Sequence, residues 1–181
     1  MLDKIEPRNY VLDPTAMDTL SKGTVIADGS TAKIIVDGND SNYVYKIYKK
    51  PNYDEPNFHY EIYSHLDNEM SDLGVAVPSF HVDSGLYRMQ RIDTSKPLYD
   101  EDVWASLNAN LQKEYLWRAR IFLKSLAGYG LFLKNVEAYI QDDDTIMFID
   151  FGDTYRAEPS TIFKIESSQV LPHSVTKDWT G

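Results

Sequence analysis

Cysteine is absent from this chain of 181 residues, so the protein forms no disulfide and no thiolate metal site. No apolar stretch is long enough to span a membrane, and residues 1–7 lack the apolar segment of a signal peptide. These absences predict a soluble, cytosolic protein with no membrane partner. It would reside in its own cell or in a host cell to which it is delivered.

Positive charge is also scarce, because 18 lysines and arginines stand against 28 aspartates and glutamates and give a net charge of −10. Binding to duplex nucleic acid requires clustered basic side chains, so nucleic acid is not expected as a partner. The four histidines show no metal-ligand spacing. The acidic balance favours solubility or a basic protein partner.

The chain has enough apolar residues for a core, since 43% of it is hydrophobic, and its length fits one domain or one small two-lobed unit. Short apolar runs at 24–26, 33–36 and 43–48 are separated by two polar turns that contain glycine. This succession of short runs and turns predicts an antiparallel meander.

Residues 56–70 are predicted to form a helix. Phe58, Ile62 and Leu66 recur there at helical spacing, and Glu61 lies beside that stripe.

One long helix is predicted over residues 109–127, with strands at 75–77 and 85–92 and a polar connection at 93–101 before it. A β-hairpin follows the helix, with residues 142–144 at its turn. These three aspartates lack the spacing of a calcium loop, so we interpret them as a solvated hairpin turn.

The residues that carry chemistry begin with Asp150-Phe151-Gly152, which follows the apolar run 145–149. A β-branched and aromatic run is typical of a buried strand, and a carboxylate at its end can hold magnesium against nucleotide phosphates. Asn135 lies upstream, where a kinase has its second metal ligand, and Lys46 is a candidate for the lysine that pairs with the phosphates. Together these residues predict a protein-kinase fold.

The predicted fold class is therefore α+β and protein-kinase-like. Residues 1–18 would form an N-terminal arm. Residues 19–92 would form an N-lobe with an antiparallel sheet and one helix, and residues 93–181 a truncated, mainly helical C-lobe.

Four short motifs follow one another in a specific order and spacing. They are a phosphate-loop segment at 29–34, the approach to the lysine at 39–46, a hinge segment at 87–92 with 97–98, and the strand end at 149–151. In these motifs the sequence resembles the OspG/NleH type of minimal effector kinases, which bacteria deliver into host cells. The resemblance covers residues 20–156.

The resemblance implies a role for each matching residue. Lys46 would pair with the phosphates of the nucleotide, Glu61 would hold Lys46 through an ion pair, and both would sit between the lobes. Asn135 and Asp150 would bind magnesium. The implied cofactors are ATP and magnesium.

The same resemblance implies that backbone groups near Gln90 and Arg91 meet the adenine edge. It also implies that the turn containing Gly29 and Ser30 covers the phosphates. This turn departs from the kinase pattern, because Gly29 is its one remaining glycine and Asp28 places a carboxylate where it should repel phosphates.

The proton-accepting aspartate of a kinase is missing. By the spacing of the family it would stand at Gly130, or at Phe132 if the loop is shortened, and the segment 128–134 contains no carboxylate and no histidine. Its loss should slow phosphoryl transfer by orders of magnitude, although positioning and metal can leave residual activity. The chain after Gly152 also lacks an obvious activation segment and peptide-docking helices, so ordinary peptide-substrate recognition is not expected.

Three functions are compatible with this pattern. The first is a pseudokinase that keeps a partial ATP and magnesium site and acts by binding and modulating a partner protein. The second is an active but atypical serine/threonine kinase that phosphorylates a host protein. The third is an interaction module that needs no nucleotide. By resemblance, the host's ubiquitin-conjugating machinery is a candidate partner, and a bacterial effector and a phage protein both fit the chain.

Overall fold

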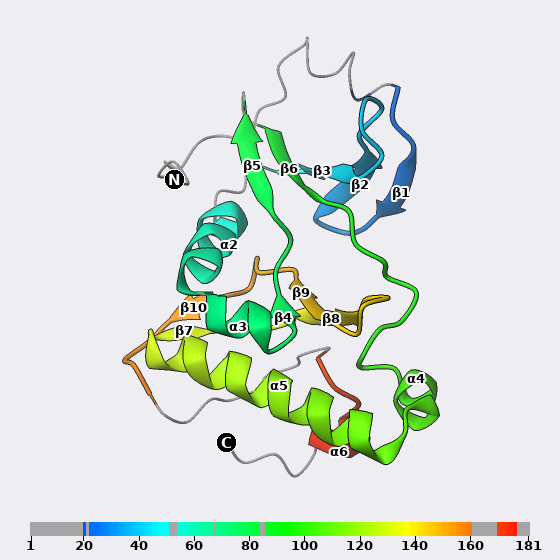
Figure 1. The fold of residues 1–181 in the computed structure, drawn as a ribbon. Helices are drawn as coiled ribbons and strands as arrows, with labels where there is room; N and C mark the ends of the chain where they lie inside the picture. The colour runs from blue at the N-terminus through cyan, green and yellow to red at the C-terminus, as the bar shows by residue number, and fades with distance from the viewer. Residues whose placement is uncertain are drawn as a thin grey trace. The chain divides into compact units, whose positions relative to one another are not determined.

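The first unit of the structure is built on an antiparallel sheet, and the second on a long helix and a smaller sheet (Figure 1). The computed structural model describes residues 20, 22–50, 54–66, 68–83, 86–160 and 170–176. The first unit comprises Met1–Asn57 and Pro78–Arg91, and the second comprises Phe58–Val77 and Ile92–Gly181. The predicted arm over residues 1–18 lies outside the described residues.

The sheet of the first unit contains five strands. They are β1 (Val25–Asp28), β2 (Ala32–Val36), β3 (Tyr43–Tyr48), β5 (Phe80–Asp83) and β6 (Leu86–Gln90). Their order is β1-β2-β3-β6-β5, and every pairing is antiparallel. Valine, isoleucine and tyrosine are frequent in them, and such side chains suit a pleated, half-buried surface. The predicted meander is confirmed, whereas β5 was not among the predicted strands.

A buried carboxylate, that of Asp37, links the three central strands of this sheet. It directly follows β2, is 4% exposed, and accepts hydrogen bonds from the backbone N–H of Asn39 at 2.8 Å and from Nε of Arg88 at 2.9 Å. The guanidinium of Arg88, on β6, lies over the ring of Tyr43, on β3, with 3.8 Å between Cζ and the ring centroid. The sheet is therefore fixed by charge-assisted hydrogen bonds as well as by its ladders.

The prediction of one helix over residues 56–70 is wrong, because the segment forms two helices, α2 (Asp54–His65) and α3 (Asn68–Asp72). Near the end of α2, the hydroxyl of Ser64 donates to the carbonyl oxygen of Glu61 at 2.7 Å. A side chain that bonds to the backbone in this way competes with the helical hydrogen bonds. The helix ends at His65, earlier than the spacing of its apolar residues indicates.

The sheet of the second unit has three strands, β4 (Val75–Ala76), β8 (Glu137–Ile140) and β9 (Ile146–Ile149), in the order β4-β9-β8. The strands β8 and β9 form the predicted hairpin. In contrast, β4 runs parallel to β9, with Val75 opposite Ile146. This pairing groups residues 58–77 with the second unit, whereas the prediction placed them in the lobe of residues 19–92.

The long helix α5 (Ala109–Gly128) has bounds close to the predicted 109–127. It begins at Asn108, whose side-chain oxygen accepts hydrogen bonds from two backbone N–H groups of the first turn. A shorter helix, α4 (Glu101–Ser106), precedes it and is capped in the same way by Asp100. Helix α4 was not predicted, because its residues were expected to follow a polar connection.

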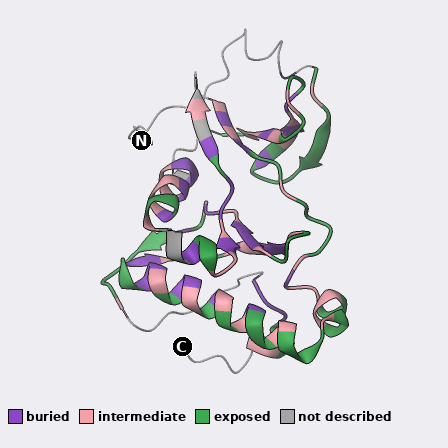
Figure 2. Ribbon diagram, viewed as in Figure 1, coloured by how far each residue is buried: buried purple, intermediate pink, exposed green. Residues whose placement is uncertain are grey.

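One face of α5 lies in the core of the second unit (Figure 2). Phe122 is fully buried, and its ring stacks on that of Phe148 in β9 with 4.0 Å between the centroids. The buried residues of α5 are Tyr115, Ala119, Phe122, Leu123, Leu126 and Ala127. Their spacing of three and four residues is the core stripe of an amphipathic helix.

Three shorter elements complete the second unit. The strands β7 (Leu131–Phe132) and β10 (Tyr155–Arg156) pair antiparallel, and α6 (His173–Thr176) is a single helical turn. Among the described residues, no helix combines the length and the apolar character that a membrane span requires.

Candidate functional site

Lys46 lies on β3 and is held by an ion pair within the first unit. Its Nζ donates to Oε1 of Glu55 at 2.7 Å, and the side chains of Lys46 and Glu55 are 12% and 4% exposed. The second carboxylate oxygen of Glu55 accepts a hydrogen bond from the hydroxyl of Tyr48. With both oxygens engaged, the carboxylate holds the ammonium group in one place. Such a fixed ammonium is suited to binding a phosphate oxygen.

Glu55, rather than Glu61, is the helix carboxylate that pairs with the lysine of β3. Glu55, His59 and Ile62 recur at helical spacing and are at most 3% exposed, so they lie on the buried face of α2. Glu61 lies off this face and receives the guanidinium of Arg156, with 2.6 Å between Nη1 and Oε1. The expected role of Glu61 is therefore corrected. Sequence reasoning missed Glu55, although its spacing from two buried positions was a usable signal.

The turn between β1 and β2, predicted to cover the phosphates, directly follows a carboxylate that is paired with two lysines. Asp28 lies 2.7 Å from Nζ of Lys49 and 3.5 Å from Nζ of Lys33. The hydrogen bond from Lys49, supported by Lys33, lowers the pKa of Asp28 below its ordinary value. Two ammonium groups and one carboxylate leave a local positive charge, so the repulsion expected from Asp28 is offset. Gly29 and Ser30 lie in this turn, where the N–H of Gly29 donates to a carbonyl oxygen of β2 at 3.0 Å.

Most backbone N–H groups of the hinge segment donate hydrogen bonds within the protein. The N–H groups of Gln90 and Arg91 both donate to carbonyl oxygens of the first unit at 2.8 Å. The N–H of Asp93 donates to a side-chain oxygen at 3.0 Å. Of the described residues 90–93, Ile92 is the one whose N–H makes no hydrogen bond. Ile92 is half-buried and was not among the predicted site residues.

Both predicted magnesium ligands have a left-handed backbone, which side chains other than glycine seldom adopt. The φ angle is 71° at Asp150 and 55° at Asn135, and Asp144, in the hairpin turn, is the third such residue among those described. Residues of this kind occur in turns and concentrate at functional sites. Asp150 directly follows β9, as the apolar run predicted, and Asn135 lies between β7 and β8.

The side chain of Asn135 donates from Nδ2 to Oδ2 of Asp153 at 2.6 Å. This hydrogen bond orients the amide and leaves its Oδ1 as an acceptor. Among the described residues, no group of three or more aspartates, glutamates or histidines could hold a metal ion by itself. Magnesium often binds through one or two carboxylates together with phosphate oxygens and water. Binding of magnesium by Asn135 and Asp150, together with nucleotide phosphates, therefore stays a prediction.

Neither position expected for the catalytic aspartate is free to take that role. Gly130 has a φ angle of 75°, and a Cβ atom there would lie 2.5 Å from the carbonyl oxygen of Ala157, so no side chain fits. Phe132 lies on β7 and stacks on Tyr155 of β10, with 5.5 Å between the centroids. Both positions therefore serve the packing of this segment.

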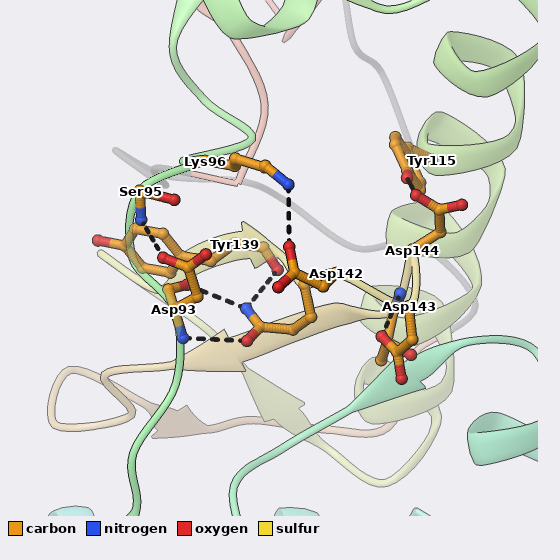
Figure 3. Close-up of polar contacts among 10 residues, drawn as sticks. Asp93, Ser95, Lys96, Tyr115, Tyr139, Asp142, Asp143 and Asp144 are labelled. Atoms are coloured by element: carbon orange, nitrogen blue, oxygen red, sulfur yellow. Dashed lines mark hydrogen bonds and ion pairs between the residues drawn. The ribbon is translucent and has the colours of Figure 1, made fainter.

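The three aspartates of the β8–β9 turn bind separate partners (Figure 3). The predicted hairpin turn is confirmed, and each carboxylate has a structural contact of its own. The contacts join Lys96 Nζ to Asp142 at 3.2 Å, the backbone N–H of Thr145 to Asp143 at 3.0 Å, and the Tyr115 hydroxyl to Asp144 at 3.3 Å.

The sequence matches no protein-family model and no curated protein. Among solved structures, the chain is similar to the kinase PK-1 of the Cydia pomonella granulovirus, with a TM-score of 0.51 and 15% sequence identity. The similarity covers 80% of this chain and 56% of that kinase. At this identity the likeness shows the fold alone. The chain thus has a protein-kinase-like α+β fold, with the antiparallel sheet first and the helices after it, as predicted.

Proposed function

We propose that this protein is a pseudokinase of the OspG/NleH type, which keeps a partial ATP and magnesium site and acts by binding and modulating a partner protein. The ion pair of Lys46 and Glu55 carries the proposal. A buried ion pair is weak evidence for stability, because desolvation offsets much of its attraction. A fixed ammonium that serves a phosphate gives the pair a functional reason.

Other residues of the chain would complete nucleotide binding. Asn135 and Asp150 would supply oxygen ligands to magnesium, which, when bound, neutralises charge on the phosphates. The N–H of Ile92 would donate to the adenine edge. The lysines beside Asp28 would give the phosphates a positive surrounding.

The blocked position at Gly130 supports partner binding rather than phosphoryl transfer as the main activity. Without a group that accepts the proton of a hydroxyl, transfer to a protein substrate loses a factor of about 10² to 10⁴ in rate. By resemblance, we propose that the partner belongs to the host's ubiquitin-conjugating machinery.

A thermal-shift titration with ATP and magnesium tests the nucleotide site. The wild type should gain several degrees in Tm, because a ligand at 100 times its Kd stabilises the fold by about 2.7 kcal/mol. Lys46→Ala should lose this gain, whereas Lys50→Ala, which changes an exposed lysine beyond β3, should keep it. No gain for the wild type, or an equal gain for Lys46→Ala, would leave an interaction module that needs no nucleotide.

An active but atypical serine/threonine kinase is the second candidate, favoured by the intact pair of Lys46 and Glu55. Incubation with γ-labelled ATP and candidate host proteins separates it from the first. Labelled protein that disappears with Asp150→Ala would favour the kinase. Nucleotide binding without label would favour the pseudokinase.

A further inference from the structure

The side of α5 that faces away from the core carries a basic stripe with a tryptophan at its centre. Lys113, Trp117, Arg120 and Lys124 recur at positions i, i+4, i+7 and i+11, which places them along one side of the helix. All four are exposed, and 49% of the surface of Trp117 is open to solvent. Figure 2 shows exposed residues alternating with buried ones along this helix.

The charge of this stripe is opposite to that of the whole chain. The helix α5 has four basic side chains and a single acidic one, Glu114, which gives it a net charge of +3 in a protein of net charge −10. Glu114 is engaged by Arg118, one turn further along the helix. Neither residue belongs to the stripe, so the stripe itself contains no acidic member.

Size and chemistry select the class of partner. From Lys113 to Lys124 the stripe extends about 16 Å at 1.5 Å per residue, which matches a short segment of protein chain. Tryptophan and arginine are enriched among the residues that dominate protein–protein binding. A long polyanion would extend past the stripe and meet the acidic remainder of the protein, which repels it.

We infer that the α5 stripe is a docking surface for an acidic segment of a partner protein. Carboxylates of that segment would meet Lys113 and Lys124, and an apolar side chain among them would cover Trp117. The inference adds an interaction surface to the proposed function and does not depend on nucleotide binding.

Fluorescence anisotropy with a labelled synthetic peptide, in which glutamates and leucines recur at helical spacing, tests the inference. Combining Lys113→Glu with Lys124→Glu should weaken binding about tenfold or more, and Trp117→Ala should weaken it about tenfold. The matched control combines Lys50→Glu with Lys96→Glu. It changes the net charge equally at exposed positions outside α5 and should keep the wild-type affinity within about twofold.

Circular dichroism checks that each variant is folded. Lys46→Ala should bind the peptide as the wild type does, so a failed nucleotide titration and a failed docking test are distinguishable. Absence of peptide binding by the wild type, or equal binding by the α5 double variant and its control, overturns the inference. Tighter binding to phosphatidylserine vesicles or to a single-stranded oligonucleotide also overturns it. So does a wild-type dimer in sedimentation that the α5 double variant loses, which would make a second copy the partner.

Discussion

The backbone conformation at Gly130, more than the identity of the side chain, determines that this segment carries no proton-accepting group. With φ at 75° and the carbonyl oxygen of Ala157 at 2.5 Å from a Cβ atom, Gly130→Ala should cost about 2 kcal/mol or more in the free energy of unfolding. Gly128→Ala is the matched control, because a Cβ atom there meets nothing within 4 Å. It should change stability by less than about 1 kcal/mol. Urea unfolding measures both.

Restoring an aspartate at position 130 should therefore not restore a kinase. The same clash applies to every side chain at this site, so Gly130→Asp should unfold more easily than the wild type and gain no phosphoryl transfer. A stable, active Gly130→Asp variant would show that the segment rearranges, and the backbone argument would then be wrong.

Asp37 offers a second test at the scale of one residue. Desolvation alone raises the pKa of Asp37, but the hydrogen bonds from the Asn39 N–H and the Arg88 guanidinium outweigh it, so the pKa lies below its ordinary value. A lowered pKa stabilises the folded state above the unfolded pKa of about 4 and stops doing so as the pH falls through the folded pKa. Asp37→Asn should cost about 2 kcal/mol at neutral pH.

The pH dependence of this cost separates charge from shape. As the pH falls through the lowered folded pKa of Asp37, the wild-type carboxyl becomes protonated, so the difference in stability between the wild type and Asp37→Asn should shrink. Urea unfolding of both proteins measures this difference in stability. The pH is varied from about 2.5 to 7, a range that includes the ordinary Asp pKa of about 4. A difference that stays constant over this range would assign the cost to packing.

At the scale of elements, α2 carries two ion-paired carboxylates, Glu55 and Glu61, which we expect to contribute unequally to stability and to the ATP response. Glu55→Gln removes the carboxylate charge that lies beside the ammonium of Lys46 in a nearly buried place, and we expect a loss of about 3 kcal/mol and a smaller ATP-induced rise in Tm. Glu61→Gln breaks a pair whose arginine, Arg156, is 60% exposed, so it should cost at most about 1 kcal/mol and leave the ATP response unchanged. Equal losses in the two variants would contradict the assignment of the pair to Glu55.

Local patterns predicted the elements that depend on neighbours in sequence. Helix α5 followed from apolar residues three and four apart, and β2 and β3 followed from short β-branched runs between turns. The parallel pairing of β4 with β9 joins segments about 70 residues apart, and no local pattern encodes such a contact. For that reason the parallel pairing of β4 with β9 could not be read from the sequence.

The candidate site, too, could be predicted only where it depends on local patterns of residues. Lys46 lies within β3 and Asp150 directly follows β9, so the apolar pattern of each strand indicated where these residues lie. The partner of Lys46 depends on which face of α2 is buried, and the helical spacing of Glu55 from Ile62 was the one local signal that pointed to it rather than to Glu61. The neutralisation of Asp28 by lysines likewise depends on cross-strand contacts that appear only in the folded sheet.

At the scale of the whole molecule, carboxylates with lowered pKa set the acid limit of stability. The folded state binds fewer protons than the unfolded state between the folded pKa of each such group and about pH 4, so the free energy of unfolding falls as the pH is lowered through this range. Exposed members contribute little, and the buried one, Asp37, contributes most. The aspartates concerned are Asp28, Asp37, Asp93 and Asp143.

Buried tyrosines set the alkaline limit. Burial, with Asp144 beside the hydroxyl, raises the pKa of Tyr115 to about 12, and burial with Glu137 beside it raises the pKa of Tyr139. Above about pH 10 the unfolded chain releases these protons while the folded chain retains them, so stability falls as the pH rises. Tyr139→Phe removes one such group, and its unfolding free energy should therefore fall less steeply above about pH 10 than that of the wild type. Urea unfolding at stepped alkaline pH measures both slopes, and identical slopes would show that Tyr139 releases its proton equally in the two states.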